Sequence, residues 1–261
     1  MFQIEVAGLV ININNRFDIV RCLCRDYITE KGGQADIEVT ASDEEIKSEH
    51  EKEPEKGYSE GYTESVVIYK KISNALVAFD AFVMHSSVVE VNGKAYAFAA
   101  ESGTGKSTHT RYWKEVLRDR ITIINGDKPI YRFMAWEGCQ RAEKSLHLAR
   151  DSNKEELFAF GTPWCGKEGW QKNTSAPLKA LCLLERGEKD EIFPLNPIKH
   201  LAELFKHFHL PGEGLVDMPK LIGLIDRMLA TVPVYRLRCR NDRSAAETVI
   251  SYFGLLKEEE K

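Results

Sequence analysis

The chain has 261 residues, of which 43% are hydrophobic and 29% charged, the composition of an ordinary globular protein long enough for a sizeable core. Its formal net charge of −4, from 36 Lys and Arg against 40 Asp and Glu, favours neither a nucleic-acid partner nor a membrane surface. The N-terminus has no basic leader before an apolar run, and no stretch approaches the about 18 apolar residues of a spanning helix. We therefore expect a cytoplasmic protein, in which a nucleotide would need a locally positive site.

The first 30 residues predict a strand or hairpin over 2–13, where Ile and Val partly alternate with polar residues. A short helix over 17–28, capped by Asn15, is expected next. The residues expected to face inward are Ile19, Leu23 and Tyr27 or Ile28. The six cysteines show no C-x-x-C pair, so no zinc ribbon or disulfide framework is expected. Cys22 and Cys24, two apart on this helix, cannot face the same way.

The next segments complete a small N-terminal α+β region, which we assign to residues 1–81. Alternation predicts a strand over 35–41. Charge dominates 42–61, for which we favour a solvated loop or frayed helix over an interaction tail. A helix is expected over 64–82, and its inward residues are Val66, Tyr69, Ile72, Leu76 and Phe79.

A second region, residues 82–261, carries the remaining elements. Asn92-Gly93 joins two alternating apolar runs, which is a strong hairpin signal, and the second run leads into a glycine-rich loop. The stretch from 127 to 158 gets no assignment. Further strands are expected at 121–126, 178–186 and 232–240, and helices at 198–209, 215–229 and 243–253. This order predicts a mixed α/β fold.

The glycine-rich loop lies in AAESGTGKSTHT, residues 99–110, and matches the phosphate-loop pattern G-x-x-x-x-G-K-[ST] except that Ala100 replaces the first glycine. An alanine of ordinary φ is acceptable at a strand end. Lys106 would reach the β and γ phosphates and Ser107 would ligate Mg²⁺. The bland alternative is a helix cap that binds no nucleotide. The expected nucleotide-binding residues are Glu101, Ser102, Gly103, Thr104, Gly105, Lys106, Ser107 and Thr108.

Two titratable residues flank this loop in the sequence. Asp127 directly follows the apolar strand ITIING, where phosphoryl-transfer enzymes place an acid that holds the metal or takes a proton. Its bland interpretation is a turn residue in N-G-D. His85, in FVMHSS, is by itself more typical of a structural histidine.

Together, M-H-S at 84–86, A-E-S-G-T-G-K-S at 100–107 and N-G-D at 125–127 resemble the bacterial HPr kinase/phosphorylases. Their core shares its fold with the ATP-dependent phosphoenolpyruvate carboxykinases. The resemblance spans about residues 82–185 and implies a P-loop kinase core using ATP and Mg²⁺. It implies that Lys106 binds phosphate, that Ser107 ligates Mg²⁺, and that Asp127 exchanges a proton with the acceptor hydroxyl and contacts the metal. His85 matches the family's histidine ahead of the loop, so the implied catalytic residues are Asp127, Lys106 and His85.

The sequence also departs from that family. Only one acid of its D-D pair is present, so either Gly126 or Lys128 replaces the other. The family's further metal-binding glutamate has no clear match, and the signature that contacts HPr is missing. We therefore regard both HPr as the substrate and the reverse dephosphorylation as in doubt. This pattern looks like a divergent subgroup of HPr-kinase-like proteins, related also to kinases of precursor peptides.

Further candidate contacts are weaker. In G-T-P-W-C-G-K, Thr162 would offer a polar contact and Lys167 a phosphate contact, although a tight turn around a buried Trp164 fits as well. On the loop helix, at most one of His109 and Arg111 can face the phosphates. Arg238 and Arg240 alternate along a strand, and would point together to a nucleotide or to solvent.

These features favour an ATP- and Mg²⁺-dependent kinase that phosphorylates a hydroxyl, with the serine of a protein or peptide favoured over a small molecule. One alternative is a nucleotide-binding regulator without catalysis, to which the missing acid gives weight. A phosphoenolpyruvate carboxykinase-like enzyme is less favoured, because those chains are much longer. The sequence does not identify the acceptor, and it does not decide whether the chain forms a homo-oligomer as HPr kinases do.

Overall fold

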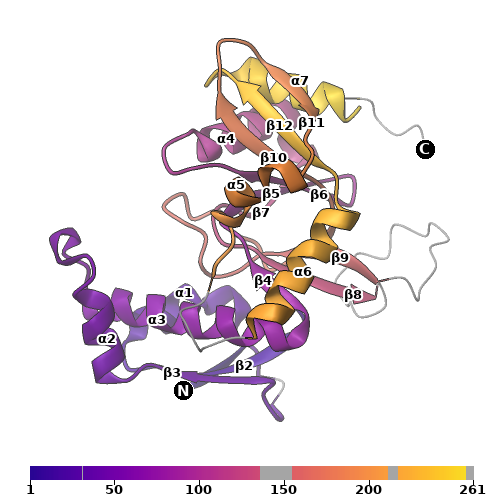
Figure 1. The fold of residues 1–261 in the computed structure, drawn as a ribbon. Coiled ribbons are helices and arrows are strands. Elements are labelled where there is room, and N and C mark those ends of the chain that lie inside the picture. Colours follow the sequence, from indigo (N-terminus) through magenta and orange to yellow (C-terminus); the bar gives the residue numbers. More distant parts are fainter. Residues whose placement is uncertain (31, 136–154, 211–216, 257–261) are drawn as a thin grey trace.

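The computed structural model describes residues 1–30, 32–135, 155–210 and 217–256, and its ribbon is shown in Figure 1. The described elements form two β-sheets with helices packed against them, so the expected mixed α/β class is confirmed. Within these ranges no helix is both long enough and apolar enough to span a bilayer.

The N-terminal region is a three-stranded sheet in the order β1-β2-β3, with helices on one side (Figure 1). Along β1 and β2 buried residues alternate with partly exposed ones, as the alternating sequence predicted. The elements are β1 (Phe2–Val6), β2 (Leu9–Asn14), α1 (Asp18–Leu23), β3 (Ile37–Thr40), α2 (Asp43–His50) and α3 (Glu60–Ala75). The predicted strands over 2–13 and 35–41 are therefore confirmed.

The prediction for α1 was wrong in its cap, and its inward face was only partly right, because Tyr27 is buried as expected but Ile19 is not. Val20, Cys24 and Tyr27 are buried, whereas Ile19 is 37% exposed. The N-cap of α1 is Phe17, and no side chain caps the first turn. Just before the helix, the buried carboxylate of Glu64 on α3 accepts hydrogen bonds from the backbone N–H groups of residues 16 and 17 at 2.7 and 3.0 Å. Cys22 is exposed and Cys24 is buried, so these two cysteines do face different ways.

The charge-rich stretch contains a regular helix in place of the expected loop or frayed helix. Ser42 and Glu45 cap α2 reciprocally, each side chain accepting from the other's backbone N–H. The following helix, α3, begins at Glu60 with Ser59 as its cap, four residues earlier than expected. Capping by short polar side chains therefore decided the boundaries of both helices.

Within the described ranges the larger sheet has nine strands, in the order β4-β8-β9-β10-β6-β5-β7, with β12 and then β11 added beside β10. Its strands are β4 (Ala81–Val83), β5 (Ser86–Val91), β6 (Lys94–Ala99), β7 (Thr122–Asn125), β8 (Ile130–Ala135), β9 (Glu155–Phe160), β10 (Ser175–Arg186), β11 (Glu191–Pro194) and β12 (Val234–Cys239). The predicted hairpin at Asn92-Gly93 is confirmed as the β5–β6 turn. The stretch left without assignment supplies β8 and β9, and its residues 136–154 lie outside the described residues.

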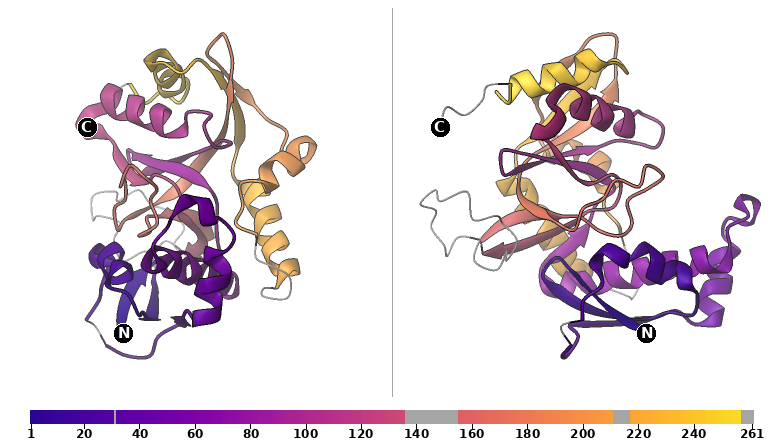
Figure 2. Two further views of the ribbon diagram at one scale, coloured as in Figure 1. Left: turned by 90° about the vertical axis from the view of Figure 1, so that its left-hand side faces the viewer. Right: turned by 180° about the vertical axis from the view of Figure 1, so that it is seen from behind.

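Among the described residues, four helices pack on this sheet. Phe98 points to one face, where Trp113 of α4 and Val249 of α7 are buried with it, and Figure 2 shows these two helices side by side. Ala97 points to the other face, against Leu221 of α6. The helices are α4 (Lys106–Leu117), α5 (Leu201–Phe205), α6 (Met218–Thr231) and α7 (Arg243–Tyr252). Single 3₁₀ turns occur at Arg25–Tyr27, Pro54–Lys56, Leu76–Phe79, Arg118–Arg120 and Ile198–His200.

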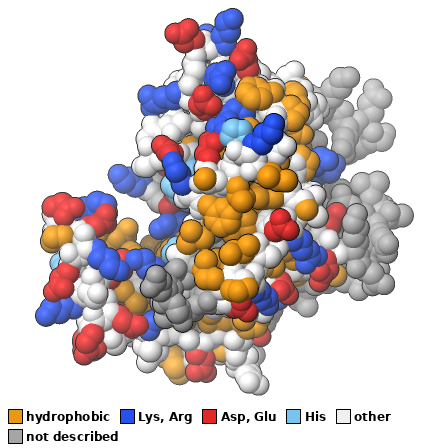
Figure 3. All heavy atoms as spheres, in the orientation of Figure 1, with side chains coloured by type: hydrophobic (Ala, Val, Ile, Leu, Met, Phe, Trp, Pro, Cys, Tyr) orange, Lys and Arg blue, Asp and Glu red, His pale blue; other side chains and the backbone are white. Residues whose placement is uncertain are grey.

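The helix expected over 198–209 ends early, at Phe205. After it the chain runs beside the end of β4, where His85 N–H donates to the carbonyl of His207 at 2.6 Å and His209 N–H donates to that of Val83 at 2.9 Å. Backbone pairing with β4 replaces the last helical turn. Apolar side chains gather on the outer face over α5 and α6, as Figure 3 shows, and the exposed ones include Leu201 and Ile222. Whether a second copy covers them stays a prediction.

The proposed boundary at 81/82 stays a prediction as well. One continuous apolar cluster joins Ile4 and Ile68 of the N-terminal region to Val83 and Phe158 of the larger sheet. Arg132 on β8 also donates to the carbonyl of Ala7 at 2.7 Å. The two regions are therefore packed together through apolar and polar contacts.

Strand direction concentrates several strand ends at one edge of the larger sheet. Strands β6, β10 and β12 are parallel, and β7 runs the same way because both β6 and β7 pair antiparallel to β5. The carboxyl ends of these four strands, and the start of β5, therefore lie along one edge. In α/β sheets this edge is where ligands usually bind.

Candidate active site

The glycine-rich loop connects β6 directly to α4, as its sequence predicted. Gly103 and Gly105 have φ of +80° and +115°, values that other residues rarely adopt, and Gly105 is the N-cap of α4. Ala100 is buried at the end of the strand, and its φ is not positive. The alanine in place of the first glycine is therefore compatible with the turn. The helix N-terminus faces the loop, an arrangement that favours anions.

A cavity of about 510 Å³, which we call the phosphate-loop cavity, lies over this turn. This volume lies in the range of roughly 300–1,000 Å³ that is usual for ligand sites. Every predicted site residue except Thr104 lines it. The lining residues are His85, Glu101, Ser102, Gly103, Gly105, Lys106, Ser107, Thr108, Gly126, Asp127, Cys165, Gly166, Lys167, Glu168, Arg186 and Asn241.

The three predicted catalytic residues meet in this cavity. His85 Nε2 lies 2.8 Å from Asp127 Oδ1, and Lys106 Nζ lies 3.3 Å from the same oxygen. Lys106 also donates to the carbonyl of Gly126 at 3.1 Å. The side chains of Lys106 and Asp127 are 10% and 23% exposed, so the pair is partly shielded from water while the cavity still reaches it. A cation and a carboxylate therefore stand together at the start of the loop helix.

Burial and charge act against each other on this pair. Burial raises the pKa of Asp127, but the hydrogen bond from His85 and the charge of Lys106 outweigh it and hold that pKa well below its usual range. Burial lowers the pKa of Lys106, and the attraction of Asp127 only partly restores it. Asp127 is therefore a carboxylate in the free protein, with one oxygen already engaged.

The turn that carries Asp127 is built by Asn125. The side-chain oxygen of Asn125 accepts from the backbone N–H groups of Asp127 and Lys128, both at 2.8 Å, and its amide donates to Thr162. Thr162 is 1% exposed, and its hydroxyl donates to the carbonyl of Lys128. The expected role of Thr162 as a contact in the cavity was therefore wrong, because its hydroxyl is used to hold the Asp127 turn.

The structure also explains why Asp127 has no acidic neighbour in the sequence. A Cβ on Gly126 would lie 2.9 Å from the carbonyl oxygen of Cys165, so the packed loop leaves no space for a side chain there. Lys128 points to the ring of Tyr69, with Nζ 4.6 Å from its centroid. Glu168, which the sequence analysis did not select, lines the cavity instead. Lys167 lines it too, as its predicted phosphate contact requires.

Oxygen ligands for a divalent cation are available but few. Among the described residues no group of three or more His, Cys, Asp or Glu is arranged to hold a metal ion. The hydroxyl of Ser107 and the carboxylate of Asp127 both face the cavity. They fit Mg²⁺, which is commonly held by one or two carboxylates, nucleotide phosphates and water. The predicted pair of Ser107 and Asp127 therefore suits a metal that arrives with a nucleotide.

The remaining predicted contacts lie elsewhere. His109 is buried beneath the loop, where Trp113 Nε1 donates to its Nε2 at 3.0 Å and burial lowers its pKa to about 3. Arg111 lies outward, 4.0 Å from Glu168. Arg238 lies 3.4 Å from Glu185. None of His109, Arg111 and Arg238 lines the phosphate-loop cavity.

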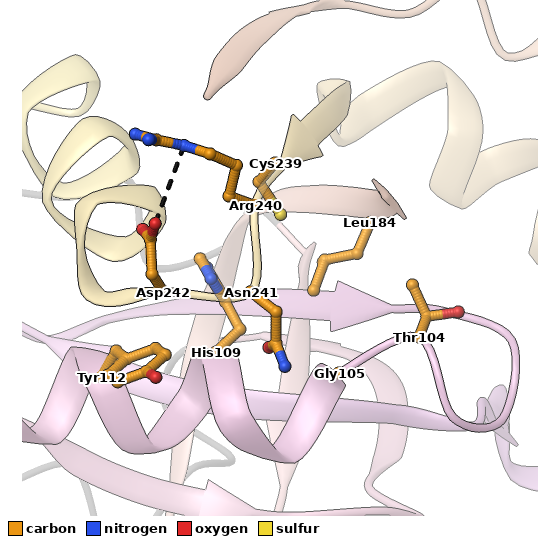
Figure 4. Close-up of a pocket in the computed structure, with 9 residues that line it drawn as sticks. All are labelled: Thr104, Gly105, His109, Tyr112, Leu184, Cys239, Arg240, Asn241 and Asp242. Carbon is orange, nitrogen blue, oxygen red and sulfur yellow. Dashed lines mark ion pairs between the residues drawn. The ribbon is translucent and has the colours of Figure 1, made fainter. Parts of the chain in front are cut away.

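Arg240 likewise does not reach the phosphate-loop cavity, because it is bound to Asp190 at 2.7 Å. It lines a much smaller pocket behind Gly105, drawn in Figure 4, together with Thr104 and His109. Asn241, one residue further along, reaches both the small pocket and the cavity.

Sequence reasoning missed Arg186 and Asn241. Both follow strands that end at the same edge as β6, since Arg186 is the last residue of β10 and Asn241 comes two residues after β12. Position after a predicted strand was the signal that singled out Asp127, and it applied equally to these two residues.

Comparison with known proteins identifies no family. No family model and no curated protein matches the chain. Among solved structures, the chain is similar to the Hpr(Ser) kinase/phosphatase from Coxiella burnetii, with a TM-score of 0.34 and 10% identity over 67% of this chain and 97% of that chain. Similarity at this level indicates a distant structural relationship and does not bear on activity.

Proposed function

We propose that the protein is an ATP- and Mg²⁺-dependent kinase that transfers the γ-phosphate to a hydroxyl, with the serine of a protein or peptide as the favoured acceptor. The observation that carries this proposal is the meeting of Lys106, Asp127 and His85 at a glycine loop that opens a helix. Phosphoryl transfer needs a positioned nucleophile and neutralisation of phosphate charge more than covalent help from the protein. The cluster combines both requirements in one cavity.

In the reaction, the bond between the γ-phosphorus and its bridging oxygen breaks, and a bond from that phosphorus to the acceptor oxygen forms. ADP leaves, and the hydroxyl proton passes to Asp127. Gly103 and Gly105 allow the loop to turn its N–H groups toward the phosphates, and Lys106 neutralises the charge that they carry. His85, 2.8 Å from Asp127, orients the carboxylate toward the acceptor.

The contact between Lys106 and Asp127 links nucleotide binding to basicity. In the free protein both His85 and Lys106 stabilise the carboxylate, so Asp127 is a weak base. Phosphates in the loop compete for the ammonium group of Lys106. Once that cation turns to the phosphates, Asp127 loses part of its stabilisation and gains affinity for a proton. A Mg²⁺ ion held by the same carboxylate would oppose this gain, so the nucleotide and the metal would set the basicity of Asp127 together.

Ser107 and Asp127 would hold the Mg²⁺ that accompanies the nucleotide. When bound, the ion supplies charge neutralisation to the phosphate oxygens. With Ser107 and Asp127 as its protein ligands, most of its remaining ligands would come from the nucleotide and water. The affinity for the metal should therefore depend on the nucleotide.

The test compares Asp127→Asn with the wild-type protein. Incubation with γ-labelled ATP, Mg²⁺ and a cell extract should label an acceptor with the wild type, and the variant should lose this transfer. The affinity for ATP without Mg²⁺, measured by calorimetry, should stay nearly unchanged. Asp226→Asn, on the exposed side of α6, is the matched control and should transfer normally. If Asp127→Asn transferred phosphate at the normal rate, Asp127 would not be the general base.

A nucleotide-binding regulator is the second candidate. It is favoured by Gly126, where the loop leaves no room for a second acid beside Asp127. In that case the wild-type protein would bind ATP but would neither label an acceptor nor release phosphate. Finding the labelled acceptor excludes this candidate.

A further inference from the structure

The phosphate-loop cavity has two ends, which lie on opposite sides of β6. We call the first the acceptor end, formed by Asp127 after β7 and His85 before β5. We call the second the nucleoside end, formed by Arg186 at the end of β10 and Asn241 after β12. Because β12, β10, β6, β5 and β7 lie side by side in this order, the loop after β6 separates the two ends.

This order sets the direction of a bound nucleotide. For transfer, the γ-phosphate has to face Asp127, and the loop holds the phosphate chain beside Lys106. The α-phosphate and the nucleoside must then extend away from Asp127, across β6. We propose that Arg186 and Asn241 form the nucleoside side of the site and contact the heteroaromatic base. The inference rests on the proposed nucleotide-dependent function and adds the orientation of the ligand.

Arg186 is held against the loop by two hydrogen bonds. Its Nη2 donates to the carbonyl of Gly103 at 2.7 Å, and its Nε donates to that of Thr104 at 3.3 Å. Both acceptors are uncharged, so the guanidinium keeps its full positive charge beside the cavity. A planar guanidinium attracts the face of an aromatic ring, and it stacks on such rings better than a lysine ammonium does. Arg186 is thus suited to stack on the base.

Asn241 stands where the chain of β12 passes the loop. Its Oδ1 lies 2.9 Å from the position that a Cβ on Gly105 would occupy, so its side chain touches the backbone at the start of α4. Figure 4 shows its amide directed toward that point. An amide offers two N–H donors and one acceptor oxygen, which suits the polar edge of a base or a ribose hydroxyl. Any group leaving the loop on this side passes Asn241.

The two arginines that the sequence suggested for this role are occupied. Arg238 lies 3.4 Å from Glu185, and Arg240 is bound to Asp190 and donates to Ser244 at 2.8 Å. Neither lines the phosphate-loop cavity. Arg238 therefore provides a matched control for a change at Arg186, since both are exposed or half-exposed arginines at the same edge of the sheet.

The experiment compares two ligands that share the phosphate chain, MgATP and magnesium tripolyphosphate. Calorimetry with Asn241→Ala and Arg186→Gln should show ATP affinity weakened by about tenfold in each, the loss expected for one stacking or polar contact. Tripolyphosphate affinity should stay within about twofold of the wild type. Arg238→Gln should change neither affinity, and unliganded melting temperatures show whether each variant is folded.

Each other outcome contradicts a specific part of the proposal. Unchanged ATP affinity in both variants would show that the nucleoside does not bind at this end of the cavity. Equal weakening of both ligands would place Arg186 or Asn241 on the phosphates or in the support of the loop. If the wild-type protein bound neither ligand, the proposed nucleotide-dependent function would itself be wrong, and the orientation would fall with it.

Discussion

The two ends of the phosphate-loop cavity differ in the exposure of the residues that would act there. At the acceptor end, Asp127 is 23% exposed, carries two close contacts on one oxygen, and sits on a turn hydrogen-bonded by Asn125. At the nucleoside end, Arg186 and Asn241 are exposed. The end with the more buried carboxylate is the one at which bonds would be made and broken, where small displacements cost most.

The acceptor end is also supported by the N-terminal region, through Tyr69 of α3. The Tyr69 ring lies 4.6 Å from Lys128 Nζ, and its centroid lies 5.4 Å from that of Trp164 and 5.2 Å from that of His209. These residues flank the Asp127 turn and the 161–170 loop. The comparison therefore suggests that substitutions at the acceptor end mainly reduce turnover, and those at the nucleoside end mainly reduce affinity.

The largest effect should follow from Lys106→Met, which removes the cation that serves both the phosphates and Asp127. We expect ATP affinity to fall by about 100-fold, because hydrogen bonds to charged groups are worth about 1.5–3 kcal/mol. Calorimetry measures it. Lys206→Met is the control, because Lys206 is exposed and does not itself line the cavity. Its ion pair with a residue that lines the cavity is the one with Glu101. Equal affinities in wild type and Lys106→Met would place the phosphates elsewhere.

A smaller effect is expected for His85→Asn, which removes the ring that orients Asp127. The kcat of transfer should fall by about 10- to 100-fold, near the lower limit for acid–base partners, with the KM for ATP nearly unchanged. Steady-state kinetics with the labelled acceptor gives both values. His50→Asn, on α2, controls for the loss of a histidine at a distance. A change confined to the KM for ATP would show that His85 acts in ATP binding. It would contradict the expectation that substitutions at the acceptor end mainly reduce turnover.

The loop itself offers a pair of opposite substitutions. Gly105→Ala forces a Cβ onto a residue with φ of +115° and against Asn241 at 2.9 Å, so ATP affinity should fall by about tenfold for a strain of about 1–2 kcal/mol. Ala100→Gly restores the usual first glycine and should change affinity less than about twofold, because Ala100 has no positive φ to relieve. A larger gain from Ala100→Gly than loss from Gly105→Ala would show that Ala100 limits binding.

The smallest effect concerns pH and the support of the acceptor end. Burial, and then the charges of Lys70 and Lys128, lower the pKa of His209 to about 4 from 6.5. The unfolded chain therefore binds a proton below about pH 6.5 that the folded protein refuses, so stability falls as pH drops from 6.5 toward 4 and is unaffected above this window.

The corresponding variant is His209→Gln. Over the about 1.5 pH units between 6.5 and 5, a fully buried group would lose about 2 kcal/mol at 1.36 kcal/mol per unit. Because His209 is partly exposed, we expect about 1 kcal/mol. Urea unfolding at pH 5 and pH 7 gives the difference for wild type and variant. If the free energy of unfolding changed by the same amount between pH 5 and pH 7 in wild type and variant, His209 would bind its proton equally well in the folded and the unfolded state.

Local sequence signals were enough for the elements that carry the site. The glycines at 103 and 105, the alternating strand before them and the helical spacing after them predict the loop, because each depends on neighbours within a few residues. The position of Asp127 after an apolar strand was visible for the same reason. The start of α1 and the end of α5 were mispredicted, because partners distant in sequence act there. Glu64 holds the backbone just before α1, and the chain after α5 pairs with the end of β4.

From the sequence alone, the phosphate loop, the strand and helix on either side of it, and the chemistry at their ends could be predicted, whereas β8 and β9 could not. Which strand ends meet depends on strand order and direction, and these are set by long-range pairing that no local pattern encodes. That pairing places His85 next to Asp127. It buries Thr162, whose hydroxyl supports the Asp127 turn and does not line the cavity. It also places Arg186 and Asn241 at the nucleoside end of the cavity.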